Sequence, residues 1–215
     1  MIRLFKLFLF NIKNYGYHNS IKIFFFELFG FIKNLNLKEF NFIEKSKTSY
    51  SKSKVSSFYN TAYIPTPYYF LYLINLQIKL YKINKFNFID LGCGYSRPAC
   101  YLISKGNKIN YLGIDIYRYD NNKKKGYKIL KHDLRDFKNT KIILNKFVKK
   151  NENNILFLSD PFDIKLIFKI ITFLSLKKKN FFVIFVNVKK NIQNKSFKLI
   201  YNKNFNQRNI KIYKN

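Results

Sequence analysis

The chain has 215 residues, of which 47% are hydrophobic, so it is long enough and apolar enough to bury the core of one domain. Its two cysteines, Cys93 and Cys100, are too few for a disulfide framework, which favours a reducing, cytoplasmic compartment. The formal net charge is +30, from 41 Lys and Arg against 11 Asp and Glu. Such a charge attracts nucleic acid or an anionic membrane.

The positive charge is carried almost entirely by lysine. Arginine, which makes bidentate phosphate contacts, is scarce, and this argues against a dedicated nucleic-acid interface. Lys, Asn, Ile, Phe and Tyr all have A/T-rich codons, so the composition of the genome explains the charge without any partner. Nucleic acid therefore stays an alternative partner. The five arginines are Arg3, Arg97, Arg118, Arg135 and Arg208.

The N-terminal segment contains two apolar stretches, 1–12 and 21–32, interrupted by basic residues. Both predict helices of an N-terminal extension. Neither reaches the roughly 20 apolar residues of a membrane span, and no signal-peptide cleavage site follows. Two interpretations stay open: the helices pack on the core or on each other, or residues 1–32 form a basic amphipathic surface that lies on a membrane.

The next 50 residues contain a linker and a helix. Residues 45–57 are rich in Ser and Lys without periodicity, which predicts a linker. We therefore divide the chain into an extension and linker, 1–55, and a domain, 56–215. Thr66 before Pro67 is a typical N-cap followed by proline at the first helical position, and apolar residues at helical spacing continue to about Ile83.

The centre of the chain is the stretch 87–99, Asn-Phe-Ile-Asp-Leu-Gly-Cys-Gly-Tyr-Ser-Arg-Pro-Ala. A short apolar strand ends in Asp90, and Gly92 and Gly94 allow a sharp turn to which a ligand can come close. Pro98 suits the first turn of a helix. Strand, Gly-x-Gly and helix together are typical of a nucleotide-binding turn.

A second acidic residue makes this motif more specific. The apolar run 111–114 ends in Asp115, which lies 115 − 94 = 21 residues after Gly94. This spacing is typical of an acid that binds ribose hydroxyls. Because Asp90 would repel a diphosphate, the pair of acids favours a nucleoside with a cationic sulfonium group. Ser96 stands where a dinucleotide motif has its third glycine.

The C-terminal half predicts strands and helices in alternation, except that the polar segment 116–126 lacks the helix expected there. The predicted strands are Tyr127–Lys131, Ile155–Leu158, Phe181–Val186 and an antiparallel pair, Phe197–Tyr201 with Asn209–Tyr213, and the predicted helices are Ile142–Val148 and Ile164–Leu174. Asp163 is a candidate N-cap for the second helix.

The chain resembles the class I S-adenosylmethionine-dependent methyltransferases from about Ser56 to the C-terminus. The resemblance rests on Phe88–Gly94, on Gly113–Asp115 and on Ser159–Phe162. It is closest to a poorly characterised bacterial group that carries a Pro-Thr-Pro element before the glycine turn. It implies an α/β fold, a doubly wound seven-strand sheet with the last strand antiparallel, and S-adenosyl-L-methionine as the cofactor.

The resemblance also implies roles for individual residues. Asp90 and the backbone of Gly92 and Gly94 would hold the methionyl end of the cofactor. Asp115 would bind the ribose and Asp133 the adenine, for which a loop cap is the alternative role of Asp133. Tyr63 and Thr66 would line the same pocket, with packing as their alternative. Asp160 and Phe162, in an acid-Pro-aromatic element, would face the methyl acceptor.

Three functions compete. The first is methyl transfer to a small molecule, glycan or protein. The second is methyl transfer to RNA or DNA, favoured by the charge and by Asp160-Pro161-Phe162, a partial match to the nucleic-acid signature. The third is a non-catalytic relative that binds a nucleoside or acts as a basic interaction module, slightly favoured by Ser96 and by the polar segment 116–126. The acceptor is not identified by any motif.

Overall fold

The computed structural model describes residues 2–36, 66–94, 96–116, 126–159, 163–176 and 180–215. Three predicted site residues, Tyr63, Asp160 and Phe162, lie outside these ranges. So do the predicted linker 45–57 and most of the segment 116–126.

The centre of the fold is one seven-stranded sheet in the order β3-β2-β1-β4-β5-β7-β6. Strands β1 to β5 are parallel and β7 is antiparallel to both of its neighbours, which confirms the predicted fold class. The strand order reverses between β1 and β4, so the carboxyl ends of these two strands flank a topological switch point. The strands are β1 Lys85–Leu91, β2 Lys108–Asp115, β3 Tyr127–Lys131, β4 Asn154–Ser159, β5 Phe181–Val186, β6 Lys198–Asn204 and β7 Asn209–Lys214.

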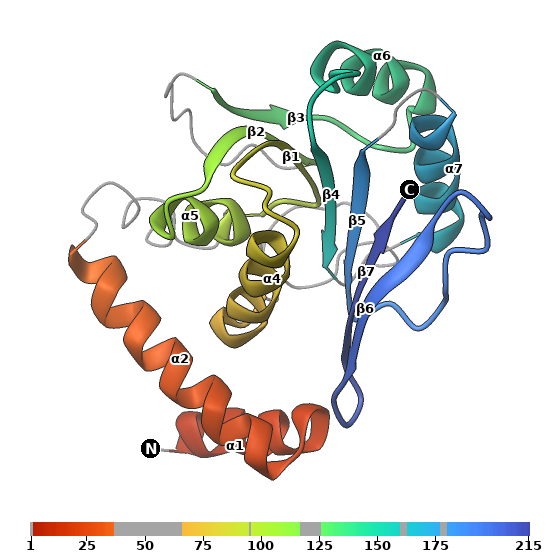
Figure 1. Ribbon diagram of the computed structural model, residues 1–215. Coiled ribbons are helices and arrows are strands. Elements are labelled where there is room, and N and C mark those ends of the chain that lie inside the picture. The colour runs from red at the N-terminus through yellow and green to blue at the C-terminus, as the bar shows by residue number, and fades with distance from the viewer. Residues whose placement is uncertain (1, 37–65, 95, 117–125, 160–162, 177–179) are drawn as a thin grey trace.

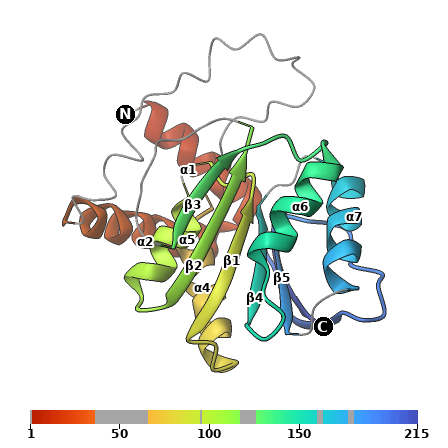
Figure 2. The ribbon, with the colours of Figure 1, turned by 90° about the horizontal axis from the view of Figure 1, so that it is seen from above.

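Helices cover both faces of the sheet (Figures 1 and 2). One face carries α4 Tyr68–Leu80 and α5 Arg97–Ser104, with α1 Ile2–Tyr15 and α2 Tyr17–Asn36 beyond them. The other face carries α6 Phe137–Phe147 and α7 Ile164–Ser175. Asp163 accepts hydrogen bonds from the backbone N–H groups of Lys165 and Leu166, so its predicted role as the N-cap of α7 is confirmed.

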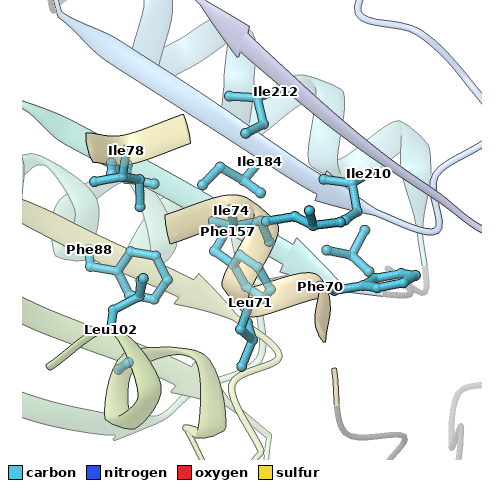
Figure 3. Close-up of a cluster of buried hydrophobic side chains, with 14 of the residues drawn as sticks. Phe70, Leu71, Ile74, Ile78, Phe88, Leu102, Phe157, Ile184, Ile210 and Ile212 are labelled. Carbon is cyan, nitrogen blue, oxygen red and sulfur yellow. The ribbon is translucent and has the colours of Figure 1, made fainter. Parts of the chain in front are cut away.

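Helix α4 supplies much of the core on its face of the sheet. Figure 3 shows its side chains Phe70, Leu71 and Ile74 among residues of β1, β4, β5 and β7. The same face of α4 was predicted from the apolar spacing, although the helix ends at Leu80 rather than near Ile83. Burial of each such side chain contributes about 1.5–3 kcal/mol, which holds α4 firmly against the sheet.

The two N-terminal helices pack on the domain. The ring of Tyr15 lies edge-on to Phe70, with 5.4 Å between the ring centroids, and Ile23 is buried in the same apolar cluster. The backbone N–H of Gln207, in the β6–β7 hairpin, donates to the carbonyl of Asn14 at 2.8 Å. Residues from opposite ends of the chain are therefore joined at the C-terminal end of α1.

The N-terminus of α4 is capped by a residue from α2. The prediction that Thr66 is the N-cap is wrong, because the cap position is Pro67 and the Thr66 hydroxyl donates instead to Ser159 Oγ at 3.0 Å. The backbone N–H of Tyr68 donates to Glu27 Oε1 at 2.8 Å. Glu27 Oε2 also pairs with Arg97 Nη1 at 2.8 Å, so one carboxylate joins α2, α4 and α5. The side chain of Pro67 has no hydrogen-bond acceptor, so the carboxylate of Glu27, which is distant in the sequence, caps the helix instead.

We expect Glu27→Ala to lower the free energy of unfolding by about 2 kcal/mol, because a helix N–H and a partly buried guanidinium both lose a charged partner. Urea unfolding would measure it. Lys22→Ala, on the exposed side of the same helix, is the control and should change stability by less than about 0.5 kcal/mol. Equal losses in the two variants would contradict a capping role for Glu27.

Candidate functional site

The glycine turn follows β1 and is tied to the end of β2. The N–H of Gly92 donates to the carbonyl of Ile114 at 2.8 Å, and the N–H of Gly94 donates to Asp115 Oδ2 at 3.0 Å. Gly92 has φ +78°, which favours glycine, and a Cβ added to it would meet nothing within 4 Å. The main chain of the turn is thus open on this side, and a ligand can approach it closely.

Ser96 takes the position that a third glycine would take. Its φ is +57°, in the left-handed region, and its side chain is fully buried. A non-glycine residue pays about 1 kcal/mol or more for this conformation. The Ser96 hydroxyl accepts a hydrogen bond from the Tyr111 hydroxyl at 2.7 Å, which offsets part of the cost. The missing glycine therefore does not disrupt the turn.

Asp90 is buried under the turn, with 2% of its surface exposed. Burial raises the pKa of its carboxyl to about 8; the Tyr111 hydroxyl, 3.4 Å from Oδ2, opposes this rise, and the charge of Asp115 adds to it. Burial also raises the pKa of the Tyr111 phenol and of the Cys93 thiol well above their ordinary values. Cys93 is thus a poor nucleophile here. At neutral pH the carboxyl of Asp90 is therefore largely protonated, and a cation bound beside it would favour the ionised form.

Gly113 allows this buried group to form. It lies in β2 directly beside Asp90 of β1. A Cβ on Gly113 would come within 2.7 Å of both Cys93 Sγ and the Tyr111 hydroxyl. The side chains under the turn therefore fit only because this position has none.

The other predicted site residues are placed in different ways. Asp133 follows β3, is 41% exposed at its side chain, and forms a bidentate pair with Arg135, which lowers its pKa. The sequence offered a loop cap as the alternative role of Asp133, and the N–H of Arg135 does donate to Asp133 Oδ1 at 2.9 Å.

Thr66 is buried beside Ser159, the last residue of β4, which precedes the predicted acceptor element in the sequence. Asp90, Gly94 and Asp115 are brought together directly.

A second feature at the same edge of the sheet is a polar cleft of about 840 Å³. It lies between the end of β5, the β6–β7 hairpin and the end of α1. Five asparagines line it together with Gln207, Lys189, Arg208 and Phe205. Amide and cationic side chains can donate to many oxygen atoms at once, so the cleft suits a strongly polar ligand. Sequence reasoning missed this cleft because its residues come from three distant segments of the chain.

Comparison with solved structures identifies the fold. Escherichia coli yhhF, a candidate methyltransferase, superposes with a TM-score of 0.52 at 14% identity, over 70% of this chain and 86% of that one. The chain has the class I methyltransferase fold. Two further methyltransferase-fold structures are similar at lower scores. A candidate methylase from Haemophilus influenzae has a TM-score of 0.49 at 16% identity, over 68% of this chain and 88% of that one. The N-methyltransferase NodS from Bradyrhizobium japonicum, solved with S-adenosyl-L-homocysteine, has a TM-score of 0.48 at 8% identity, over 82% of this chain and 97% of that one.

The sequence itself gives no such match. No family model matches the chain, and no curated protein matches it significantly. The class I fold is therefore recognised through its strand order and glycine turn, and at these identities the likeness speaks for the fold alone.

Proposed function

We propose that this protein is an S-adenosyl-L-methionine-dependent methyltransferase that acts on a polar acceptor. The observation that carries the proposal is the meeting of Asp90, Gly94 and Asp115 at the carboxyl ends of β1 and β2, beside the switch point of the sheet. Ligands of doubly wound sheets bind at this place.

The residues at the turn fit such a cofactor by their chemistry. The carboxyls of Asp90 and Asp115 lie close enough together that, besides burial, the charge of Asp115 raises the pKa of Asp90. This arrangement disfavours a phosphate and favours a cation. The open main chain at Gly92 leaves space for a ligand against the turn. A nucleoside that carries ammonium and sulfonium groups meets these requirements.

In this proposal the chain binds and orients, and the cofactor, when bound, supplies the electrophilic methyl group. Asp90 and the turn at Gly92 would hold the amino-acid end. Asp115 would hold the ribose while it fixes the turn through Gly94, and Asp133 would reach the adenine. Because a nearby cation stabilises an ionised carboxyl, cofactor binding would lower the pKa of Asp90 and release a proton. Tyr63 and Thr66 would line the pocket, and Asp160 and Phe162 would face the acceptor.

The polar cleft supports a small, oxygen-rich acceptor or a glycan. Neighbouring strands lie about 4.8 Å apart, so the end of β5 is about 10 Å from the end of β1, close enough for an acceptor to reach from one site to the other. Asn187 and Lys189, just after β5, and Arg208 in the hairpin would hold its oxygens. Methylation of RNA is the second candidate, and the net charge of +30 favours it.

Asp115→Ala tests the cofactor site. The variant loses the bond to the Gly94 N–H and a ribose acceptor, so S-adenosyl-L-methionine should bind more weakly by about 1.5–3 kcal/mol, or roughly tenfold or more. Isothermal titration calorimetry measures the affinity. Asp136→Ala is the control; it removes the N-cap of α6 and should leave the affinity unchanged. Equal affinity of Asp115→Ala and the native protein would remove Asp115 from the site.

The acceptor can be found with radiolabelled S-adenosyl-L-methionine and fractionated cell extract. Label in a polar small-molecule or glycan fraction supports the proposal, and label in RNA supports the second candidate. If S-adenosyl-L-homocysteine copurifies with the protein, the chain binds the cofactor. This result would argue against the third function, that of a non-catalytic relative that no longer binds it.

A further inference from the structure

Helix α2 carries an exposed apolar surface. Tyr17, Phe24, Phe25, Leu28 and Phe29 are each between 44% and 65% exposed, and we call them the aromatic face of α2. Within the part of the chain that the structure describes, other exposed apolar side chains of this size occur singly or in pairs, such as Leu9 and Phe10 of the neighbouring α1 and Leu76 and Leu80 of α4. A continuous exposed apolar surface of this kind marks an interaction site.

The aromatic face points away from the domain because the opposite side of α2 is occupied. Side chains three and four positions apart share one side of a helix, so Phe24 and Leu28, and Phe25 and Phe29, form a stripe. On the other side, Ile23 is buried and Glu27 binds Tyr68 and Arg97. Gly30 packs so closely on Tyr68 that a Cβ would come within 2.5 Å of its ring. The helix is held along its inner side, at the outer edge of the molecule (Figure 1).

The segment that carries this surface has a positive net charge. Residues 1–36 contain one acidic residue, Glu27, and it is paired on the inner side of α2. Lys22, three residues before Phe25, and His18, seven residues before it, are exposed on the same helix. The five basic residues of this segment are Arg3, Lys6, Lys13, Lys22 and Lys33.

We propose that the aromatic face of α2 binds the surface of an anionic lipid bilayer. A helix with aromatic and leucine side chains on one side and lysines at its border lies in the interface, with its apolar side among the acyl chains. Among the described residues, no helix is long and apolar enough to cross a membrane. A second copy of this chain is a poor occupant because two chains of charge +30 repel each other. Nucleic acid would require cationic groups rather than an apolar stripe.

The test is sedimentation of the full chain with vesicles. Native protein should pellet with vesicles of phosphatidylcholine and phosphatidylglycerol in about equal parts, less with phosphatidylcholine alone, and less at high salt, because lysines near the bilayer act through a screened attraction. The double variant Phe25→Ser/Phe29→Ser should bind the anionic vesicles at least tenfold more weakly. Both side chains are exposed, so folding should be retained, and thermal unfolding checks this.

A matched control removes exposed apolar side chains elsewhere. Leu80→Ser/Leu176→Ser changes residues that are 71% and 80% exposed on α4 and just after α7, and it should bind as the native protein does. The proposal is overturned if the native protein pellets with neither kind of vesicle, or if both double variants bind equally. It is also overturned if Phe25→Ser/Phe29→Ser abolishes a dimer seen by light scattering, or retention on RNA, while vesicle binding persists.

Discussion

Asp90→Asn is expected to make the protein more stable at pH 8 and, at the same time, to weaken its binding of S-adenosyl-L-methionine. In the folded state the pKa of Asp90 is raised to about 8, whereas an unfolded Asp has its ordinary value of 3.8. Between these two pH values the unfolded chain has released a proton that the folded chain still holds. Raising the pH therefore favours unfolding across this window, and the effect levels off above pH 8.

Asparagine has the shape of the protonated acid but does not titrate, so it removes this decline. We compare the free energy of unfolding of Asp90→Asn with that of the native protein at each pH. This difference should shift in favour of the variant by about 3 kcal/mol between pH 5 and pH 8. The same variant cannot supply a negative charge to a cation, so its affinity for the cofactor should fall at least tenfold, as expected for a lost charge-assisted contact.

Urea unfolding of both proteins at several pH values checks the first effect, and calorimetry checks the second. Asp136, an exposed acid whose pKa is lowered by hydrogen bonds from Asn139, is the control. Asp136→Asn should show no gain in stability as the pH rises. A difference between Asp90→Asn and the native protein that does not change with pH would mean that Asp90 is ionised in the folded state.

Gly113→Ala is expected to lower the free energy of unfolding by about 1–3 kcal/mol, the usual cost of overpacking a core. The new Cβ would stand 2.7 Å from Cys93 Sγ and from the Tyr111 hydroxyl, so both groups must move. Tyr111 would then lose its 2.7 Å bond to Ser96, which holds the turn in its left-handed conformation. Cofactor binding should weaken together with stability.

A double-mutant cycle separates this clash from a general effect of the substitution. In a Cys93→Ala background one of the two close contacts is gone, so Gly113→Ala should cost less, with a coupling of about 1 kcal/mol. Denaturant unfolding of the four proteins gives this value. Gly113→Ala without loss of stability, or with the same loss in both backgrounds, would contradict the packing described here.

Much of the fold could be predicted because its signals are local. Strands β3 and β5 begin and end at the predicted residues, Tyr127–Lys131 and Phe181–Val186. The turn with Gly92 and Gly94 was predicted because a left-handed conformation demands a residue without a Cβ. Other elements were predicted with shifted ends; β6, for example, is Lys198–Asn204 rather than 197–201. Edges of elements depend on partners that the local pattern does not contain.

By itself, the sequence determined the order of the elements, the parallel sheet with its antiparallel last strand, and the two acids beside the glycine turn. Only the tertiary structure decided what surrounds them: Glu27 as the cap of α4 in place of Thr66, Tyr111 as the partner of Ser96, and Gly113 as the space for both. The reason is that helix and strand preferences act between residues near in sequence. Burial, hydrogen bonding and steric fit act between residues that become neighbours only when the chain has folded.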